Sequence, residues 1–117
     1  MLVVESLKKS VIYEEIKYDY WYRLIRSGIT LDTGNGTMDI QSYGIEVERQ
    51  NTTNDGMINI ERESIMSISP QRSKVHSLLK IVADNSVSPI HLVDVLGEYV
   101  DEYVIDYDNI LRQTVNC

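Results

Sequence analysis

Carboxylate and imidazole side chains that could bind a metal ion recur near the C-terminus. His91, Asp94 and Glu98 share one face if residues 89–104 form a helix. Nitrogen and oxygen ligands of this kind suit several divalent metals. The competing interpretation is the polar side of an amphipathic helix, and the only other histidine, His76, falls in a different predicted helix. We predict no metal site, and a metal or small-ligand sensor on this acidic helix remains an alternative.

A second candidate for chemistry is the run Ile29-Thr-Leu-Asp32-Thr-Gly34. Apolar residues leading into Asp-Thr-Gly resemble the active-site loop of retroviral-type aspartic proteases, which are short chains acting as homodimers. The resemblance implies two Asp32 carboxylates sharing one proton, because like charges so close cannot both ionise. The chain departs from that pattern: Asn35-Gly36 follows, a glycine-rich flap is lacking, and Val95-Leu96-Gly97 falls in a predicted helix. We interpret the run as a turn, predict no catalytic residue, and keep the homodimeric protease as an alternative.

Length and composition indicate a single domain over residues 1–117. Apolar residues make up 43% of the chain and charged residues 25%, close to the averages for folded domains. No apolar run approaches the roughly 20 residues of a membrane span, and the N-terminus lacks the charge order of a signal peptide. The single cysteine, Cys117, permits neither an intrachain disulfide nor a thiolate metal site. We expect a cytoplasmic protein that has no cofactor and does not enter a membrane.

The negative charge is concentrated in one segment. The net charge is −7, and residues 81–111 hold seven acids and no Lys or Arg, whereas the rest of the chain balances eleven acids against eleven bases. An acidic surface repels phosphate backbones. A DNA-binding helix-turn-helix would also need basic residues in its second helix, and residues 89–104 hold four acids and no Lys or Arg. We therefore expect no nucleic-acid partner.

Alternating apolar and polar residues predict an antiparallel sheet over residues 1–68. The predicted strands cover residues 2–7, 11–26, 38–50 and 57–68, with a short additional strand at 29–32 left open. In the second strand the tyrosines share one face, which we assign to the core, while Trp21 and most charges share the other. The apolar parity changes between Ile40 and Tyr43, which predicts a bulge at residues 42–44.

Two Ser-Pro pairs predict the starts of two amphipathic helices. Ser69-Pro70 and Ser88-Pro89 each place a hydroxyl at the N-cap and a proline at the first helical position. Apolar residues then recur at helical spacing: Val75, Leu78, Leu79 and Val82, followed by Leu92, Leu96, Tyr99, Val100 and Tyr103. The short linker between them predicts an antiparallel helical hairpin over residues 69–105. Residues 106–117 form a C-terminal tail that either breaks or extends the second helix.

The predicted fold is therefore α+β. An N-terminal antiparallel meander of three to five strands packs one face against a C-terminal antiparallel two-helix hairpin, so that the sheet and the helices bury each other's apolar surfaces. The opposite face of the sheet, which carries Trp21, is then either solvated or covered by a partner.

Two surfaces are candidates for binding a partner. Trp21 lies on the charged side of its strand, and exposed aromatic side chains often anchor interfaces, although packing at the sheet edge is the competing interpretation. The outer face of the second helix is the other candidate, and its acids are Asp94, Glu98, Asp101 and Glu102. We predict a non-enzymatic protein-interaction or regulatory domain that binds either a basic protein surface or a second copy of itself.

Three segments resemble a family of short bacterial proteins of unknown function from spore-forming anaerobes. They are Tyr43-Gly44-Ile45-Glu46, Val75-x-x-Leu78-Leu79 and Asn85-x-Val87-Ser88-Pro89-x-His91-Leu92-x-Asp94-Val95, within roughly residues 40–105. Most of these are structural residues: a strand glycine, core aliphatics and a helix start. The resemblance therefore implies no activity, ligand or catalytic residue.

Overall fold

The computed structural model describes the backbone of residues 1–115 and the side chains of residues 1–113, and it shows an antiparallel sheet followed by two helices. The sheet has the order β1-β2-β3-β4, with strands β1 (Leu2–Tyr13), β2 (Ile16–Asp32), β3 (Thr37–Thr52) and β4 (Ile58–Ser69). Helix α1 (Arg72–Asp84), the short 3-10 helix η1 (Pro89–His91) and helix α2 (Leu92–Val115) follow. The predicted α+β meander is confirmed. The cysteine expectation concerns Cys117, which lies outside the described residues.

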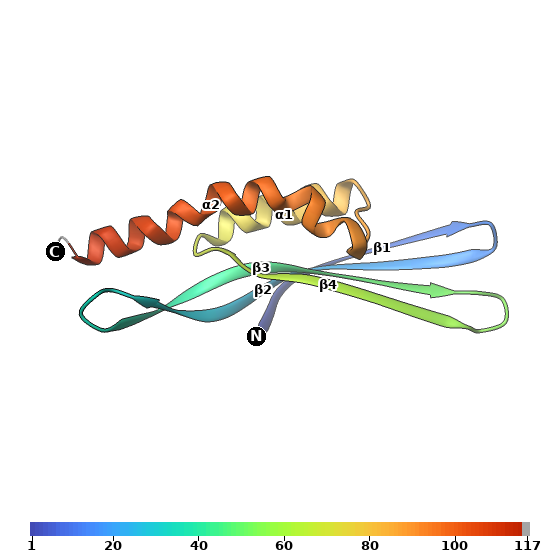
Figure 1. The fold of residues 1–117 in the computed structure, drawn as a ribbon. Helices are drawn as coiled ribbons and strands as arrows, with labels where there is room; N and C mark the ends of the chain where they lie inside the picture. Colours follow the sequence, from blue (N-terminus) through green and yellow to red (C-terminus); the bar gives the residue numbers. More distant parts are fainter. Residues whose placement is uncertain (116–117) are drawn as a thin grey trace.

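The sheet is longer than the helical layer that covers it (Figure 1). The molecule measures 61 × 21 × 20 Å and has a radius of gyration of 17.1 Å, against about 13 Å for a compact domain of this length. Both helices lie on one face of the sheet, and the β1–β2 and β3–β4 hairpins project beyond them at one end (Figure 1). The helices therefore cover only part of that face.

Two predicted strand ends were wrong. The sequence predicted one strand at residues 2–7 and another beginning at residue 11, whereas β1 continues to Tyr13 and the chain turns at Glu14 and Glu15. These two residues have φ values of 51° and 67°, as a two-residue type I′ hairpin requires. Asn-Gly usually marks such a turn, and glutamates give no comparable signal. The strand predicted over residues 11–26 also has the wrong end, because β2 continues to Asp32 and includes the short strand left open at 29–32.

The core lies where the middle of β2 and β3 meets both helices. Its buried residues are Tyr22, Leu24, Tyr43, Ile45, Val47, Ile68, Val75, Leu78, Leu79, Val82, Ala83, Val87, Leu92 and Leu96. The Tyr22 hydroxyl donates to the carbonyl oxygen of Val87 at 3.0 Å, which satisfies the one polar atom of this fully buried ring. The face assigned to the core and the apolar stripes of both helices are confirmed.

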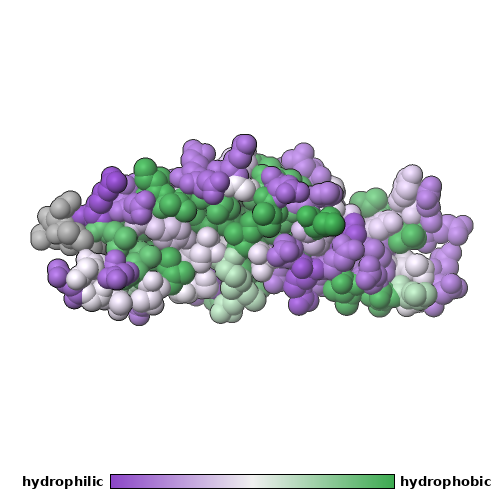
Figure 2. Space-filling model, viewed as in Figure 1, coloured by the Kyte–Doolittle hydropathy of each residue, from purple (hydrophilic) through white to green (hydrophobic). Residues whose placement is uncertain are grey.

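Hydrophobic side chains also reach the surface along the helical layer and on the projecting hairpins (Figure 2). Ile90 is 74% exposed beside the start of α2, and Met57 is 71% exposed at the β3–β4 turn. Ile12 is 74% exposed near the β1–β2 turn. These side chains lie beyond or outside the helix-covered core, so folding of the chain alone leaves them in water.

Only one Ser-Pro pair begins a helix as predicted. Ser88 is the N-cap of η1, with Pro89 at its first position, although the Ser88 side chain makes no capping hydrogen bond. Ser69 instead ends β4, and α1 begins after the N-cap Gln71. The Ser69 hydroxyl accepts the Gln71 N–H at 3.0 Å and donates to Asp106 at 2.7 Å. The Ser69 prediction was wrong because that hydroxyl joins β4 to α2 rather than capping α1.

The end of α1 is a Schellman motif, which turns the chain within a few residues. The Ser86 N–H donates to the Ala83 carbonyl at 3.1 Å, and the Val87 N–H donates to the Val82 carbonyl at 3.0 Å. Ser86 has a φ of 50°, a left-handed conformation that usually selects glycine at this position. The motif buries Val87 next to the core and brings the chain back toward β4.

Helix α2 extends through the residues for which the sequence left a break open. The Asp106 carboxylate is buried and accepts hydrogen bonds from Lys74 at 2.8 and 3.0 Å and from Ser69. The Tyr107 hydroxyl contacts the Ser42 hydroxyl of β3. Burial alone would raise the pKa of Asp106, but the bonds from Lys74 and Ser69 outweigh it and lower the pKa. These contacts hold α2 on α1 and the sheet, while the packing of the two helices as a hairpin remains a prediction.

Gly44 lies where β4 passes closely over β3. The β3–β4 register shifts opposite Gly44, while the β2–β3 register is unbroken. A Cβ atom on Gly44 would lie 2.0 Å from the carbonyl oxygen of Ile65 and 2.4 Å from that of Met66. The irregularity lies at the position where the sequence predicted a bulge, but the extra residues belong to β4 and not to β3. Only glycine fits beneath them.

Replacing Gly44 with alanine is expected to lower the free energy of unfolding by about 3 kcal/mol, because the methyl group collides with two backbone carbonyls. The matched control is Gly97→Ala in α2, where an added Cβ has nothing within 4 Å. That change is expected to raise stability by up to about 1 kcal/mol, since alanine favours helices. Urea denaturation measures both variants. A Gly44→Ala protein as stable as the wild type would contradict the placement of β4.

Candidate interaction surfaces

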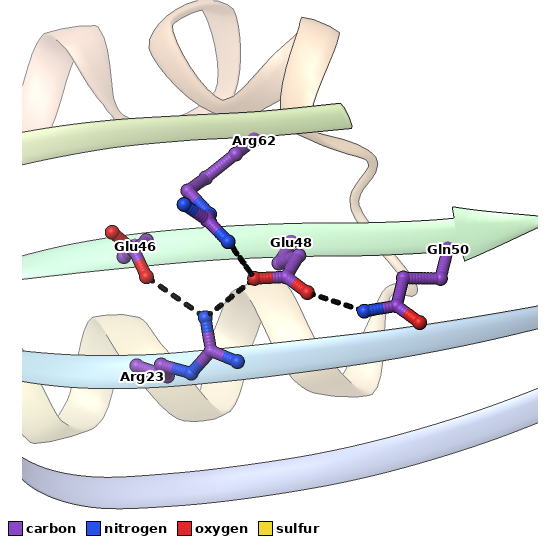
Figure 3. A network of polar contacts seen from close by, with 5 residues as sticks. All are labelled: Arg23, Glu46, Glu48, Gln50 and Arg62. Carbon is purple, nitrogen blue, oxygen red and sulfur yellow. Dashed lines mark hydrogen bonds and ion pairs between the residues drawn. The ribbon is translucent and has the colours of Figure 1, made fainter. Parts of the chain in front are cut away.

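The sheet face away from the helices carries a network of charged side chains (Figure 3). Side chains alternate along a strand, so the neighbours of the core residues in β2 and β3 point to this open face. Arg23 donates to Glu46 at 2.8 Å and to Glu48 at 3.0 Å. Arg62 of β4 donates to Glu48 at 2.6 Å, and Gln50 donates to the other oxygen of Glu48 at 2.8 Å. The network therefore joins β2, β3 and β4.

Glu48 is the centre of this network and is only 4% exposed. Burial alone would raise its pKa, but hydrogen bonds from Gln50, Arg62 and Arg23 outweigh burial and lower the pKa from 4.5 to about 2. The sequence pattern placed Glu48 on the polar face without singling it out. The sequence does contain a signal for this network, because neighbouring predicted strands carry opposite charges. That signal identifies Glu48 only when the register of the strands is known.

Trp21 lies on the same open face. It pairs with Lys8 of β1 and Glu48 of β3 in the sheet register. The Lys8 ammonium is 5.2 Å from the centre of the indole ring, within the range of a cation–π interaction. The ring is half-buried, so part of its surface is already used within the sheet. Its role in binding a partner stays a prediction.

The four acids predicted as a binding surface lie together on the outer side of α2. Asp94, Glu98, Asp101 and Glu102 are all exposed, and helical geometry places them within an arc of about 100°. We call this surface the acidic α2 face. The helices cover one face of the sheet and Trp21 lies on the other, so the structure does not bring the two predicted surfaces together.

Aliphatic side chains lie among and beside the four acids of α2. Val93, Val104 and Ile105 are 55%, 51% and 52% exposed. Ile105 follows Asp101 by four residues and therefore shares its side of the helix. The outer side of α2 is consequently part acidic and part apolar, which the sequence analysis did not point out.

The Asp32 candidate is the last residue of β2, next to the turn between β2 and β3 that our preferred interpretation predicted. Its carboxylate accepts the Gly34 N–H at 2.8 Å, and the Thr33 N–H donates to the Gly36 carbonyl at 3.0 Å. Asp32 is exposed, and the segment Val95-Leu96-Gly97 is helical. The carboxylate therefore serves as a turn acceptor in this structure.

The two histidines are separated. His76 on α1 contacts Glu5 of β1 through Nδ1 at 2.7 Å, whereas His91 is exposed at the end of η1. Within residues 1–115, no three His, Cys, Asp or Glu residues come close enough together to hold a metal ion. The arrangement of His91 with the acids of α2 is that of an exposed polar helix side.

Residues 1–102 match the model of a family described as Family of unknown function (DUF6514). The chain belongs to this family. The match spans all four strands, α1 and the first half of α2, and it confirms the resemblance to a family of unknown function. No curated protein and no solved structure matches the chain.

The helices described for this family member are also too short or too polar to cross a bilayer. Neither α1 nor α2, over residues 1–115, combines the length and apolar character of a membrane span. In α2 acidic residues recur among the apolar residues along the helix, so no long stretch is apolar throughout.

Protonation of Glu48 is expected to destabilise the protein as the pH falls from 4.5 to about 2. Because the folded-state pKa lies below the unfolded value, the stabilisation is complete above pH 4.5 and is lost as the pH falls through the folded-state pKa. Glu48→Gln should lower the free energy of unfolding at neutral pH by roughly 2 kcal/mol and flatten its acid dependence.

The matched control is Glu63→Gln, which removes an exposed carboxylate from the neighbouring strand. Chemical denaturation over a pH series measures all three proteins. The network does not hold Glu48 ionised if Glu48→Gln and Glu63→Gln have the same pH profile.

Proposed function

We propose that this protein is a non-enzymatic protein-binding domain whose acidic α2 face docks on a basic protein surface. The observation that carries the proposal is the pairing of four exposed acids with exposed aliphatics on one helix. Exposing Ile105 to water among these acids gives the isolated protein no stability. Apolar area within a charged surface is typical of interfaces that bury the aliphatics and pair the charges.

Charge complementarity selects the kind of partner. The protein has a net charge of −7, and its excess lies in the segment that includes α2. Two copies meeting through this face would bring like charges together, which disfavours self-association there. A surface rich in Lys and Arg would instead be attracted over roughly 10 Å at moderate salt.

The open sheet face is the weaker candidate for docking. Arg23, Glu46, Glu48 and Arg62 already satisfy one another, so a partner would gain little by contacting them and would desolvate a network that is complete. Trp21 is half-buried beneath Lys8. These contacts favour a structural role for the open face.

We also propose that the protein is cytoplasmic and comes from a spore-forming anaerobic bacterium. One cysteine in 117 residues is consistent with a reducing compartment, because small secreted domains commonly depend on disulfides. The bacterial source rests on the resemblance of the strand and helix segments alone.

Replacing both Glu98 and Asp101 with lysine is expected to abolish partner capture, because the attraction to a basic surface becomes repulsion. The experiment compares proteins captured from a bacterial lysate by tagged wild type, by the double variant and by Trp21→Ala. A partner of the acidic α2 face is retained by wild type and Trp21→Ala, lost by the double variant, and released by salt.

The matched control replaces Glu14 and Glu15 with lysine in the β1–β2 turn. Both residues are exposed, and the change in net charge equals that of the α2 variant. Capture that survives the α2 variant but is lost in Trp21→Ala would move the binding surface to the open face. Light scattering that shows a stable homodimer disrupted by either variant would identify the partner as a second copy.

A further inference from the structure

A shallow cleft of about 400 Å³ lies on the helix side of the sheet, at the point where the helical layer ends. Its lining consists of Val11 and Tyr13 from β1, Tyr18 and Tyr20 from β2, Arg49 from β3, and Ser86 from the linker after α1. The volume falls within the range of roughly 300–1,000 Å³ typical of ligand sites. None of these residues belongs to the acidic α2 face.

The floor of the cleft is a row of tyrosine rings. Tyr20 is parallel to the buried Tyr22, with ring centres 6.0 Å apart. The guanidinium of Arg49 is 5.8 Å from the centre of the Tyr18 ring. Tyr13 is 64% exposed at the outer end. Rings already held by neighbours lose little conformational entropy when a ligand packs on them.

Every polar side chain of the cleft can donate a hydrogen bond, and only the hydroxyls among them can also accept one. Three tyrosine hydroxyls, the Ser86 hydroxyl and the Arg49 guanidinium line it, and no carboxylate or amide does. One Arg49 nitrogen donates to Glu61 at 2.8 Å, but its buried Nε–H has no acceptor within the described part of the chain. Burial would lower the pKa of Arg49, and hydrogen bonds to Glu61 and Tyr20 outweigh it and raise the pKa.

We propose that this cleft binds a proline-rich peptide segment in the polyproline II conformation. Such a segment offers flat apolar rings to the tyrosines and carbonyl oxygens to the donors, and its prolines bring no N–H that would need an acceptor. Aromatic-lined grooves recognise polyproline II segments in this way, because the ligand is already ordered before it binds. An ordinary extended peptide would bring one N–H per residue, and the only side-chain acceptors that line the cleft are hydroxyl oxygens.

Ser86 gives the proposal an internal test. Its φ of 50° is strained for serine and unstrained for glycine, yet serine places a hydroxyl on the cleft wall. Ser86→Gly is expected to raise the melting temperature while weakening peptide binding. If Ser86 has only a structural role, Ser86→Gly should raise the melting temperature and leave the Kd for the peptide unchanged.

The test titrates the isotope-labelled full-length protein with an acetylated oligoproline of about ten residues and, separately, with a Gly-Ser peptide of equal length. Oligoproline should shift the NMR signals of the cleft residues, and the Gly-Ser peptide should not. Tyr18→Phe, which removes only a hydroxyl, and Tyr13→Ala should each raise the Kd for oligoproline about tenfold. The control Tyr99→Phe changes a ring on α2 and should leave the Kd unchanged.

Three results would overturn the proposal: no oligoproline shifts at the cleft, equal binding of the Gly-Ser peptide, or an unchanged Kd in both Tyr13→Ala and Tyr18→Phe. Binding that survives all three cleft variants would place the peptide elsewhere. The double lysine variant at Glu98 and Asp101 should still bind oligoproline, so this proposal and the acidic α2 face fail or succeed separately.

Discussion

One buried patch, where the middle of β2 and β3 meets both helices, holds this fold together. Each large side chain buried there contributes roughly 1.5–3 kcal/mol. The patch joins β2, β3, β4, α1 and α2, and Val4 and Leu7 of β1 pack against it. Lys74, Ser69 and Asp106 add a polar contact at its edge that keeps the second half of α2 in place. Beyond the patch, the sheet has to be stabilised without a second layer.

On the open face, behind the patch, a network of charges joins the strands, and Ile25 is buried on the same side of β2. Glu48 accepts bonds from residues on β2, β3 and β4, so one carboxylate ties three strands together. The edges are protected by other means. Lys8 and Lys9 lie in the outer strand β1, and β4 is distorted where it passes over Gly44. Charged residues and bulges at the edge strands discourage pairing with other chains.

The mismatch in length between sheet and helices also creates the surfaces available for recognition. Because the helical layer ends at the Ser86 turn, tyrosines that continue the core face beyond it become the floor of an open cleft. Because α2 is amphipathic and covers the sheet from outside, its acids and several aliphatics face water. These are the two surfaces that we propose bind a protein and a peptide, and the family to which the chain belongs is of unknown function.

Local patterns in the sequence were sufficient for the class of fold. Period-two tyrosines identified the core face of β2, and helical spacing identified Leu78, Leu79 and Leu96 as buried, because these periodicities follow from backbone geometry alone. The turn at Glu14-Glu15 carried no such signal. Ser69-Pro70 did carry a helix-start signal, but it was misleading, because the Ser69 hydroxyl donates to Asp106 far away in the chain.

The acidic segment shows most clearly which features follow from the sequence and which require the tertiary structure. The sequence by itself determined that residues 81–111 are acidic and that Asp94, Glu98, Asp101 and Glu102 share one side of a helix. Only the tertiary structure decided that Asp106 leaves that acidic group, because Lys74 and Ser69 approach it from other elements and make its burial favourable. The same holds for Glu48 and for the tyrosine cleft. Burial and pairing depend on which distant strands and helices come together, and a periodic pattern within one segment does not contain that information.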